Sequence, residues 1–206
     1  MNPAAQFPHT GAVILAAGQS RRMGTPKLVL PWGSETVVGR VVSVLQAAGI
    51  GQIVVVTGAN RVQVESALQS KALTLVHNPQ YTQSEMLASL QIGLRALDAD
   101  INGSLVVLGD QPQIEAPIVE EIARRAGERL DALIVPSYQN RRGHPWLAGR
   151  ALWEGIFALN DPPQTLRDFL RDHARQIEYV NVDSPSVLAD VDTPEDYHRQ
   201  RPQNGA

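Results

Sequence analysis

The sequence predicts an α/β fold, in which a mostly parallel sheet is covered by helices on both faces and so forms a three-layer sandwich. Short apolar runs typical of strands alternate along the chain with stretches whose apolar residues have helical spacing. The chain has 206 residues, of which 43% are hydrophobic, which is enough for one domain of ordinary size and too little for two large ones. We therefore expect a single domain over residues 1–206.

Each predicted element of the first half has its own signal. The apolar run Gly11–Gly18 ends in glycine. The residues between Gln52 and Gly58 are all β-branched, as in strands buried on both faces. A helix is expected over Thr36–Gly49, because its apolar spacing stops at Gly49, a typical C-terminal cap. The other elements expected here are helices at Asn60–Ser70 and Ser84–Leu97 and strands at Ala72–Asn78 and Ser104–Pro112.

The second half continues the alternation with one interruption. The segment Gln139–Trp146 fits neither a helix nor a buried strand, and we expect a small subdomain or a β-hairpin there. The elements expected around it are helices at Ala116–Glu128, Thr165–Ala174 and Thr193–Gln200 and strands at Asp131–Tyr138 and Ile177–Val182.

Composition excludes several classes of function. The net charge of −3 leaves no strongly basic surface, which argues against nucleic acid as a partner. There is no apolar run of about 18 residues, so no membrane span is expected, and the N-terminal residues lack the pattern of a signal peptide. The chain has no cysteine, which excludes disulfides and thiolate metal sites and favours a cytoplasmic location.

In open α/β sheets the ligand lies beyond the carboxyl ends of the strands. The residues that follow predicted strands are therefore the candidates for a site, and they are the loop after Gly18, Thr57–Asn60, Gly109–Pro112 and the segment Asp190–Asp192.

The loop after the first strand is basic and contains Arg21, Arg22 and Lys27. Backbone N–H groups in a glycine-rich turn can point together at an anion, while arginine binds phosphate bidentately and lysine acts as a movable point charge. The spacing excludes both the P-loop and the dinucleotide-binding motif G-x-G-x-x-G. From the residues alone, a surface turn with solvated basic side chains remains an equal alternative.

Carboxylates follow two other predicted strands. Asp110 lies in a Gly-Asp-Gln-Pro turn, where it can bind Mg²⁺, a hard cation that prefers oxygen ligands, or satisfy its own turn. Asp190 and Asp192 alternate with Val191, so both can point the same way. Solvated or helix-capping roles for these two remain open, whereas Asp196 already has a structural role in a predicted cap at Thr193.

The segment LAAGQSRRMGTPKLVLPWG (15–33) closely resembles the signature loop of the MobA-like nucleotidyltransferases, and most of all that of their molybdenum cofactor cytidylyltransferase branch. The GDQP turn, the DVDTPED segment (190–196) and the GHP segment (143–145) resemble further motifs of that family. The resemblance follows the whole chain in element order. It implies a Rossmann-like, GT-A-like fold of the nucleotide-diphospho-sugar transferases, with a nucleotide-binding half at about 11–110 and an acceptor-binding half at about 111–200.

The resemblance implies a role for each matched residue. Lys27, Arg22 and Asp110 are the expected catalytic residues, with Lys27 near the α-phosphate. Asp110 and Asp192 are the expected ligands of Mg²⁺, or of Mn²⁺ in its place, and Asp190 is the reserve for the second ligand. The expected nucleotide-binding residues are Leu15, Ala16, Ala17, Gly18, Arg21, Arg22, Lys27, Thr57 and Ser89.

Three details of the resemblance bear on the substrates. Ala17, where the guanylyltransferase branch tends to have glycine, favours CTP. Ala88 replaces the first serine of a family segment that ends S-S-L-x-x-G-L, which leaves Ser89 to contact the ribose or base. Arg142 and His144 are expected to bind the acceptor. His144 has no neighbour at metal-ligand spacing, and from the residues alone a lone histidine is more often structural or hydrogen-bonded than catalytic.

The implied activity is a Mg²⁺-dependent nucleotidyl transfer, in which CMP passes from CTP to the terminal phosphate of molybdopterin to give molybdopterin cytosine dinucleotide and pyrophosphate. A molybdenum hydroxylase-type apoenzyme is a further partner that the resemblance implies. The alternatives are a GTP-using molybdopterin guanylyltransferase, another transferase acting on a sugar or alcohol phosphate, and a non-catalytic chaperone of the finished cofactor. The presence of Lys27, Asp110 and Asp192 argues against the chaperone, because a passive carrier needs no metal clamp.

Overall fold

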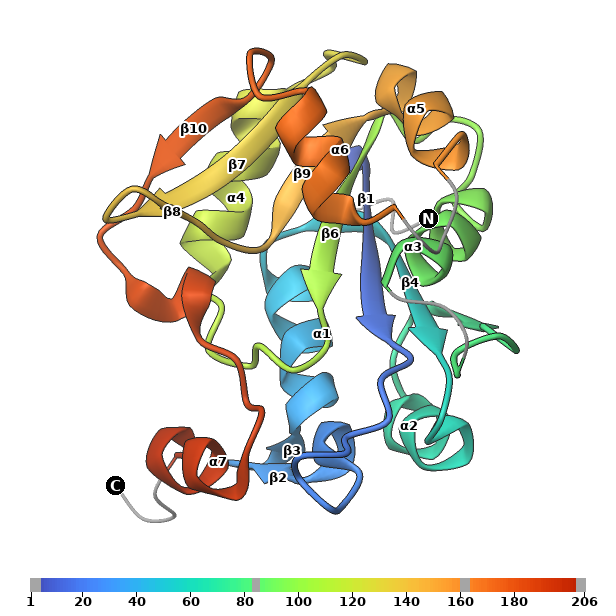
Figure 1. The fold of residues 1–206 in the computed structure, drawn as a ribbon, viewed down its shortest axis with the longest axis vertical. Helices are drawn as coiled ribbons and strands as arrows, with labels where there is room; N and C mark the ends of the chain where they lie inside the picture. Colours follow the sequence, from blue (N-terminus) through green and yellow to red (C-terminus); the bar gives the residue numbers. More distant parts are fainter. Residues whose placement is uncertain (1–4, 83–85, 160–163, 203–206) are drawn as a thin grey trace.

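The computed structural model describes residues 5–82, 86–159 and 164–202. It confirms the α/β fold, with a sheet that is mixed and mostly parallel (Figure 1). The sheet contains eight strands, seven of them in the order β10-β7-β9-β6-β1-β4-β5, and β8 pairs with β7 at its side. The strands are β1 (Phe7–Ala16), β4 (Ile50–Thr57), β5 (Thr74–His77), β6 (Gly103–Leu108), β7 (Leu133–Tyr138), β8 (Arg141–Arg142), β9 (Trp146–Gly149) and β10 (Glu178–Asn181).

Helices cover both faces of the sheet. Their bounds are α1 (Val37–Ala47), α2 (Arg61–Leu68), α3 (Met86–Arg95), α4 (Ala116–Ala126), α5 (Trp153–Phe157), α6 (Leu166–Asp172) and α7 (Pro194–Gln200). Short 3-10 turns are η1 (Lys27–Val29), η2 (Arg150–Leu152) and η3 (Pro185–Leu188), and β2 (Pro31–Trp32) forms a separate hairpin with β3 (Glu35–Thr36).

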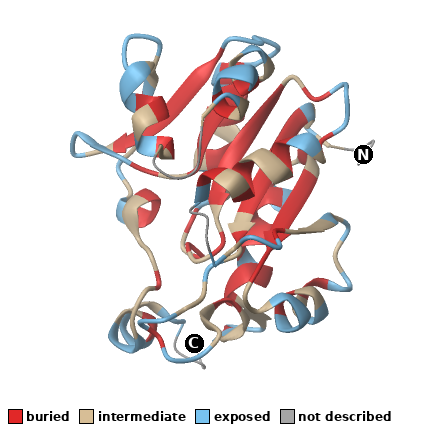
Figure 2. Ribbon diagram, turned by 45° about the vertical axis from the view of Figure 1, so that its right-hand side comes forward, coloured by how far each residue is buried: buried red, intermediate tan, exposed pale blue. Residues whose placement is uncertain are grey.

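Two apolar cores lie on opposite faces of the sheet, because successive side chains of a strand point to opposite sides. In β1, Ala12 and Ile14 belong to the core under α1 and α4, whereas Val13 belongs to the core under α3, α5 and α6. Figure 2 shows the central strands as a buried band between the two helical layers. This arrangement is the predicted three-layer sandwich.

Most predicted elements are present, with shifted ends. Thr36 caps α1 by accepting a hydrogen bond from the Gly39 N–H, and Gly49 has a φ of 73°, as its predicted capping role requires. The predicted helix Ser84–Leu97 is α3, and Ser84 lies outside the described residues. No helix in the described part of the chain is long and apolar enough to cross a membrane.

The segment Gln139–Trp146 forms the hairpin expected as one of two alternatives. Gln139 and Asn140 have positive φ values of 49° and 61° and form the turn between β7 and β8. The following strand β9 was not predicted: it enters the main sheet antiparallel to both β6 and β7. It lies between the parallel strands β6, β1, β4 and β5 on one side and the parallel pair β7 and β10 on the other.

Candidate functional site

The carboxyl ends of β1 and β6 lie side by side, because the two strands pair in parallel with Leu15 opposite Leu108. Past these ends the Gly109 N–H donates to the Leu15 carbonyl at 3.1 Å. The first loop leaves β1 here, and Asp110 follows β6. The sheet therefore places the basic loop beside the first predicted metal ligand.

The first loop is folded on itself by short-range hydrogen bonds. Ser20 has a φ of 51°, and its carbonyl accepts from the N–H groups of Met23 at 3.1 Å and Gly24 at 3.2 Å. Its hydroxyl accepts from the Lys27 N–H at 3.3 Å. Met23 is buried and anchors the loop to the core, while Arg22 remains exposed.

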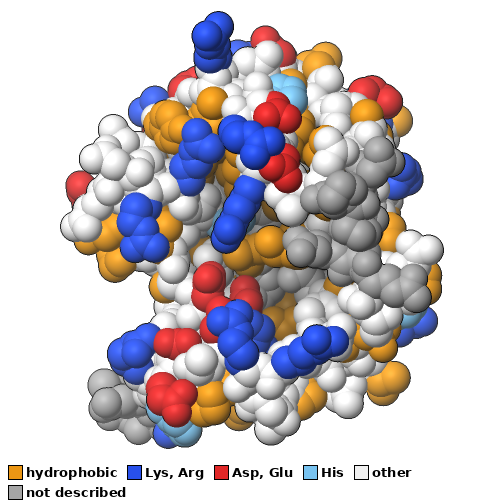
Figure 3. Space-filling view, viewed as in Figure 1, with side chains coloured by type: hydrophobic (Ala, Val, Ile, Leu, Met, Phe, Trp, Pro, Cys, Tyr) orange, Lys and Arg blue, Asp and Glu red, His pale blue; other side chains and the backbone are white. Residues whose placement is uncertain are grey.

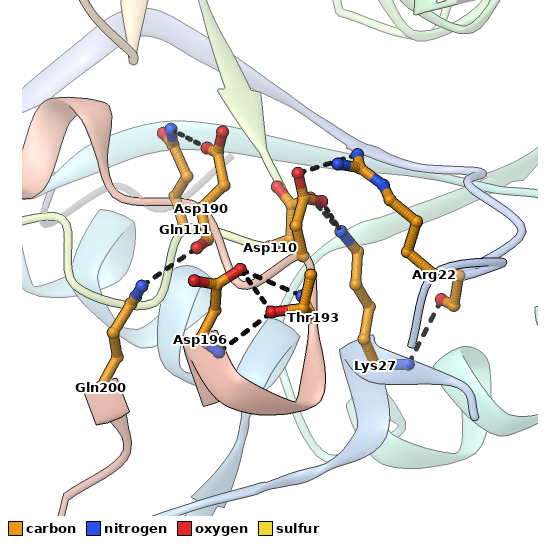
Figure 4. A network of polar contacts seen from close by, with 10 residues as sticks. Arg22, Lys27, Asp110, Gln111, Asp190, Thr193, Asp196 and Gln200 are labelled. Carbon is orange, nitrogen blue, oxygen red and sulfur yellow. Dashed lines mark hydrogen bonds and ion pairs between the residues drawn. The ribbon is translucent and has the colours of Figure 1, made fainter. Parts of the chain in front are cut away.

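Four charged side chains meet at this edge of the sheet, and Figure 4 shows Arg22, Lys27 and Asp110 among them. The Lys27 ammonium Nζ lies 2.5 Å from Asp110 Oδ2 and 2.7 Å from Asp192 Oδ1. Arg22 contacts the other oxygen of Asp192, Oδ2, at 2.9 Å. Residues from three distant parts of the sequence thus converge on one cluster, which we call the Lys27 cluster (Arg22, Lys27, Asp110 and Asp192).

The Lys27 cluster is partly shielded from water, since the Lys27 side chain is 12% exposed. Burial alone would lower the pKa of Lys27, but the charges and hydrogen bonds of Asp110 and Asp192 outweigh it, so this pKa lies above its ordinary value. The ammonium is therefore held in its charged form and balances two carboxylates.

Asp190 has a different environment from Asp192. Its carboxylate accepts a hydrogen bond from Gln111 Nε2 at 2.5 Å, and its carbonyl accepts one from Gln200 Nε2 at 3.2 Å. Burial raises the pKa of Asp190, and the nearby charges of Asp110 and Asp192 add to the rise. Of the two candidates for the second metal ligand, it is Asp192 that shares Lys27 with Asp110.

Gln111 was not singled out from the sequence, although it lies in the GDQP turn. It is 3% exposed and fixes the segment before α7 by holding Asp190. In the same segment the Val191 N–H donates to the Asp110 carbonyl at 2.9 Å. The sequence feature that could have identified Gln111 is its place, as a polar amide, between a predicted buried strand and Pro112.

The carboxylate oxygens of the Lys27 cluster are suitable ligands for a divalent metal. The two carboxylates already bind one cation, the Lys27 ammonium, from two sides. Among the described residues no group of three or more His, Asp or Glu side chains could hold a metal by itself. Two carboxylates completed by substrate phosphates are the ligand set that Mg²⁺ usually takes in proteins.

The other residues predicted to bind nucleotide line the same edge with varied exposure. The Ala17 carbonyl accepts from the Ala59 N–H at 3.4 Å, which joins the loops after β1 and β4, and Arg21 is exposed and donates to Gln19. Thr57 is fully buried, and its hydroxyl donates to the Val76 carbonyl at 3.2 Å. These roles stay predictions.

Ser89, also predicted to bind nucleotide, lies on α3. It is 3% exposed, and its hydroxyl accepts a hydrogen bond from Asn78 Nδ2 at 3.0 Å. Asn78 follows β5 directly and is itself buried. The side chain of Ser89 thus supports the end of β5, and its nucleotide contact stays a prediction.

Arg142 lies on β8, and His144 follows this strand. In the view of Figure 1, the surface is hollowed between the part of the molecule that contains β8 and the part that contains α7 (Figure 3). Arg142 is exposed, and its Nε donates to the Tyr179 hydroxyl at 2.8 Å. The His144 N–H donates to the Val187 carbonyl at 2.9 Å. Burial lowers the pKa of His144 to about 4, and its Nδ1 has no hydrogen-bond partner among the described residues. The imidazole is neutral at physiological pH.

Comparison with known proteins places these features in a family. A family model for the MobA-like NTP transferase domain matches residues 12–177. A molybdenum cofactor cytidylyltransferase of Escherichia coli is 30% identical over 90% of this chain and 92% of its own length. A nicotine blue oxidoreductase of Paenarthrobacter nicotinovorans is 29% identical over 94% of this chain and 97% of its own.

Solved structures of similar fold also match this chain. Rv0371c of Mycobacterium tuberculosis has a TM-score of 0.81 and 27% identity, covering 94% of this chain and 97% of its own. The same protein was also solved in complex with manganese, with a TM-score of 0.77 and 26% identity, covering 93% of this chain and 97% of its own.

Proposed function

The chain belongs to the MobA-like NTP transferase family and so to the nucleotidyltransferases, and we propose that it transfers CMP from CTP to the terminal phosphate of molybdopterin. The products are molybdopterin cytosine dinucleotide and pyrophosphate. The observation that supports this most directly is the Lys27 cluster, in which one ammonium and two carboxylates meet at the carboxyl ends of the strands.

The reaction needs charge stabilisation more than proton transfer. An oxygen of the acceptor phosphate forms a bond to the α-phosphorus of CTP, and the bond from that phosphorus to the leaving pyrophosphate breaks. A phosphate monoester is largely ionised near neutral pH, so a general base is not required. Catalysis then rests on positioning and on cations placed where negative charge develops.

The proposed roles follow the position of each group. Lys27 stabilises the charge at the α-phosphate, and the exposed Arg22 holds the leaving pyrophosphate. Asp110 and Asp192 hold a divalent metal, Mg²⁺ or Mn²⁺, which supplies further charge stabilisation when bound. The manganese complex of Rv0371c, which has a similar fold, supports the proposal that this chain binds a divalent metal.

The acceptor is proposed to bind on the opposite side of the hollow, in the half formed by residues from about 111 to 200. The exposed Arg142 can pair with an anionic phosphate, and neutral His144 can accept or donate a hydrogen bond there. Preference for CTP is supported by Ala17 and by the E. coli relative. A molybdenum hydroxylase-type apoenzyme is the proposed recipient of the product.

Pyrophosphate release with each of CTP, GTP, ATP and UTP, with and without molybdopterin and Mg²⁺, tests the proposal. We expect release only with CTP, molybdopterin and metal together, and its loss in Asp110→Asn. A preference for GTP would contradict the cytidylyltransferase assignment in favour of a guanylyltransferase.

Two other outcomes identify functions of another class. If Asp110→Ala loses pyrophosphate release but still supports molybdoenzyme maturation in cells, the chain is a cofactor chaperone. If no nucleotide is turned over and the chain instead acts on nicotine blue, it shares the activity named for the P. nicotinovorans relative.

A further inference from the structure

The Lys27 ammonium lies between the two carboxylates that are the proposed metal ligands. Its Nζ is 2.5 Å from Asp110 Oδ2 and 2.7 Å from Asp192 Oδ1, and Figure 4 shows the Lys27 side chain pointing toward Asp110. A metal ion that used these same two oxygens would need the position that the ammonium holds. Lys27 and the metal therefore have overlapping sites.

The side chain at this position is one that can move. Of the 18 Lys and Arg residues in the sequence, only Lys27 and Lys71 are lysines. Lysine carries a compact charge on a flexible four-carbon stem, whereas arginine presents a rigid fork. Met23 and Leu28 are buried on either side of Lys27 and hold the backbone, so a change of partner by the ammonium would come from rotation of its side chain.

We propose that Lys27 is an exchangeable internal cation, which neutralises Asp110 and Asp192 until a metal–nucleotide complex takes its place and which then pairs with the triphosphate. This inference rests on the proposed function, because it assumes that the two carboxylates bind metal. It gives Lys27 a second role beyond contact with the α-phosphate: it makes binding of metal and of nucleotide depend on each other. Metal alone must displace the ammonium, whereas the metal–nucleotide complex offers the ammonium new partners.

Coupled binding of this kind has a measurable consequence. The apparent affinity for metal alone is the intrinsic affinity multiplied by the fraction of molecules in which Lys27 has left the carboxylates. The smaller this fraction is, the more the affinity is reduced. A variant without the ammonium is free of this reduction. We therefore expect Lys27→Met to bind Mn²⁺ alone at least about tenfold more tightly than the wild type, as measured by electron paramagnetic resonance of free Mn²⁺.

Arg22→Met is the matched control for a general effect of charge. Arg22 also pairs with Asp192, at 2.9 Å, but its side chain is 72% exposed and it does not lie between the two carboxylates. Because exposed ion pairs are weak, we expect a change in Mn²⁺ affinity of less than about threefold. An equal gain in both variants would overturn the inference, since removal of any nearby positive charge would then suffice.

Nuclear magnetic resonance of the wild type tests the exchange without a substitution. Protein labelled with ¹⁵N-lysine has two side-chain ammonium groups, and Lys71 is an internal reference because it is paired away from the site, with Glu35 at 2.8 Å and Ser43 at 2.6 Å. We expect Mg²⁺ to shift the Lys27 signal, CTP with Mg²⁺ to shift it further, and neither to move Lys71. Metal binding with an unchanged Lys27 signal would overturn the inference.

The two measurements separate this inference from the proposed function. If the wild type releases pyrophosphate but Lys27→Met binds Mn²⁺ no more tightly than the wild type, only the inference fails. If the wild type binds Mn²⁺ neither alone nor with CTP and releases no pyrophosphate, the proposed function and the inference fail together.

Discussion

Asp190 and Asp192 are two residues apart and chemically identical, yet they have different partners. Asp192 pairs with Lys27 and Arg22, whereas the carboxylate of Asp190 accepts a hydrogen bond from Gln111. The intervening Val191 is buried, and its backbone is fixed to Asp110. Asp192 is therefore held at the Lys27 cluster, and Asp190 is held at Gln111.

This difference predicts unequal effects of the same substitution. Asp192→Asn removes a charge from the Lys27 cluster, and we expect kcat/KM to fall by about 100-fold or more, as for the loss of a group that stabilises transition-state charge. Asp190→Asn keeps an oxygen that can accept from Gln111, and we expect a loss of less than about threefold. Steady-state pyrophosphate release measures both, and a larger loss for Asp190→Asn would reverse the assignment of the second carboxylate.

His144 predicts a pH dependence of stability. Its pKa is about 4 in the folded chain, against an ordinary value of 6.5. Between these two values the unfolded chain binds the proton and the folded chain does not, so stability is full above 6.5 and declines as the pH falls toward 4. The decline approaches about 1.4 kcal/mol per pH unit.

Urea unfolding at a series of pH values checks this prediction by comparison with His144→Gln, which cannot titrate. We expect the free energy of unfolding of the wild type to fall relative to that of the variant across this window. Parallel curves for the two proteins would show that His144 is freely solvated.

Lys27, Asp110 and Asp192 could be named as candidates from the sequence, because each belongs to a recognisable motif. Their meeting in one cluster agrees with the predicted roles, which stay to be tested. Gln111 could not be predicted, because its partner Asp190 lies 79 residues away and an amide side chain belongs to no chemical motif. The position of the Lys27 ammonium between the two carboxylates could not be predicted either, because it depends on distances that only the folded chain gives.

At the scale of elements, α6 and α7 begin with the same capping box. Thr165 and Thr193 each accept a hydrogen bond from the N–H of the aspartate three residues later, and that aspartate binds back to the threonine N–H. The two caps differ in position, because Thr193 directly follows Asp192. Helix α7 is further held by the Tyr197 hydroxyl, which donates to the Pro31 carbonyl at 2.6 Å.

The two caps give a matched pair of variants. Thr165→Ala and Thr193→Ala should each lower the free energy of unfolding by about 1 kcal/mol, the usual value of an N-cap. Only Thr193→Ala loosens the backbone beside Asp192, so we expect it alone to lower kcat/KM for pyrophosphate release. Urea unfolding and steady-state kinetics measure the two effects, and equal kinetics in both variants would show that the cap does not position Asp192.

At the scale of the whole molecule, the spacing of the layers depends on small residues. A Cβ atom at Gly93 in α3 would lie 3.0 Å from Val56 Cγ2 and closer still to Val13 Cγ1. A Cβ atom at Gly155 in α5 would meet Phe169 Cε2 at an ordinary 3.7 Å. Helix α3 therefore packs against the sheet at a distance that only glycine allows.

This contrast predicts opposite effects of two Gly→Ala substitutions. Gly93→Ala should lower the free energy of unfolding by about 1–3 kcal/mol, the usual cost of overpacking a core. Gly155→Ala should raise it by up to about 1 kcal/mol, because alanine favours a helix. Urea unfolding compares them, and a stabilising Gly93→Ala would show that α3 can shift away from the sheet.

The sequence predicted the sandwich and most of its elements, because alternating apolar periods mark strands and helices directly. Strand order and the place of β9 could not be predicted. Trp146–Gly149 is a short apolar segment with no periodicity of its own, and its pairing with β6 and β7 is decided by the rest of the sheet. The division into nucleotide-binding and acceptor-binding halves stays a prediction.

Strand β9 has a consequence for how the chain could be divided. It lies between β6, from the first half, and β7, from the second, so residues 146–149 complete the edge that β6 would otherwise expose. A cut in the exposed segment 127–131 would separate two fragments, one with an unpaired edge at β6 and the other with an unpaired edge at β9, which pair with each other in the intact chain. Such fragments are suited to reassemble by complementation, and a split version of this chain would report the proximity of two fused partners by regaining its activity.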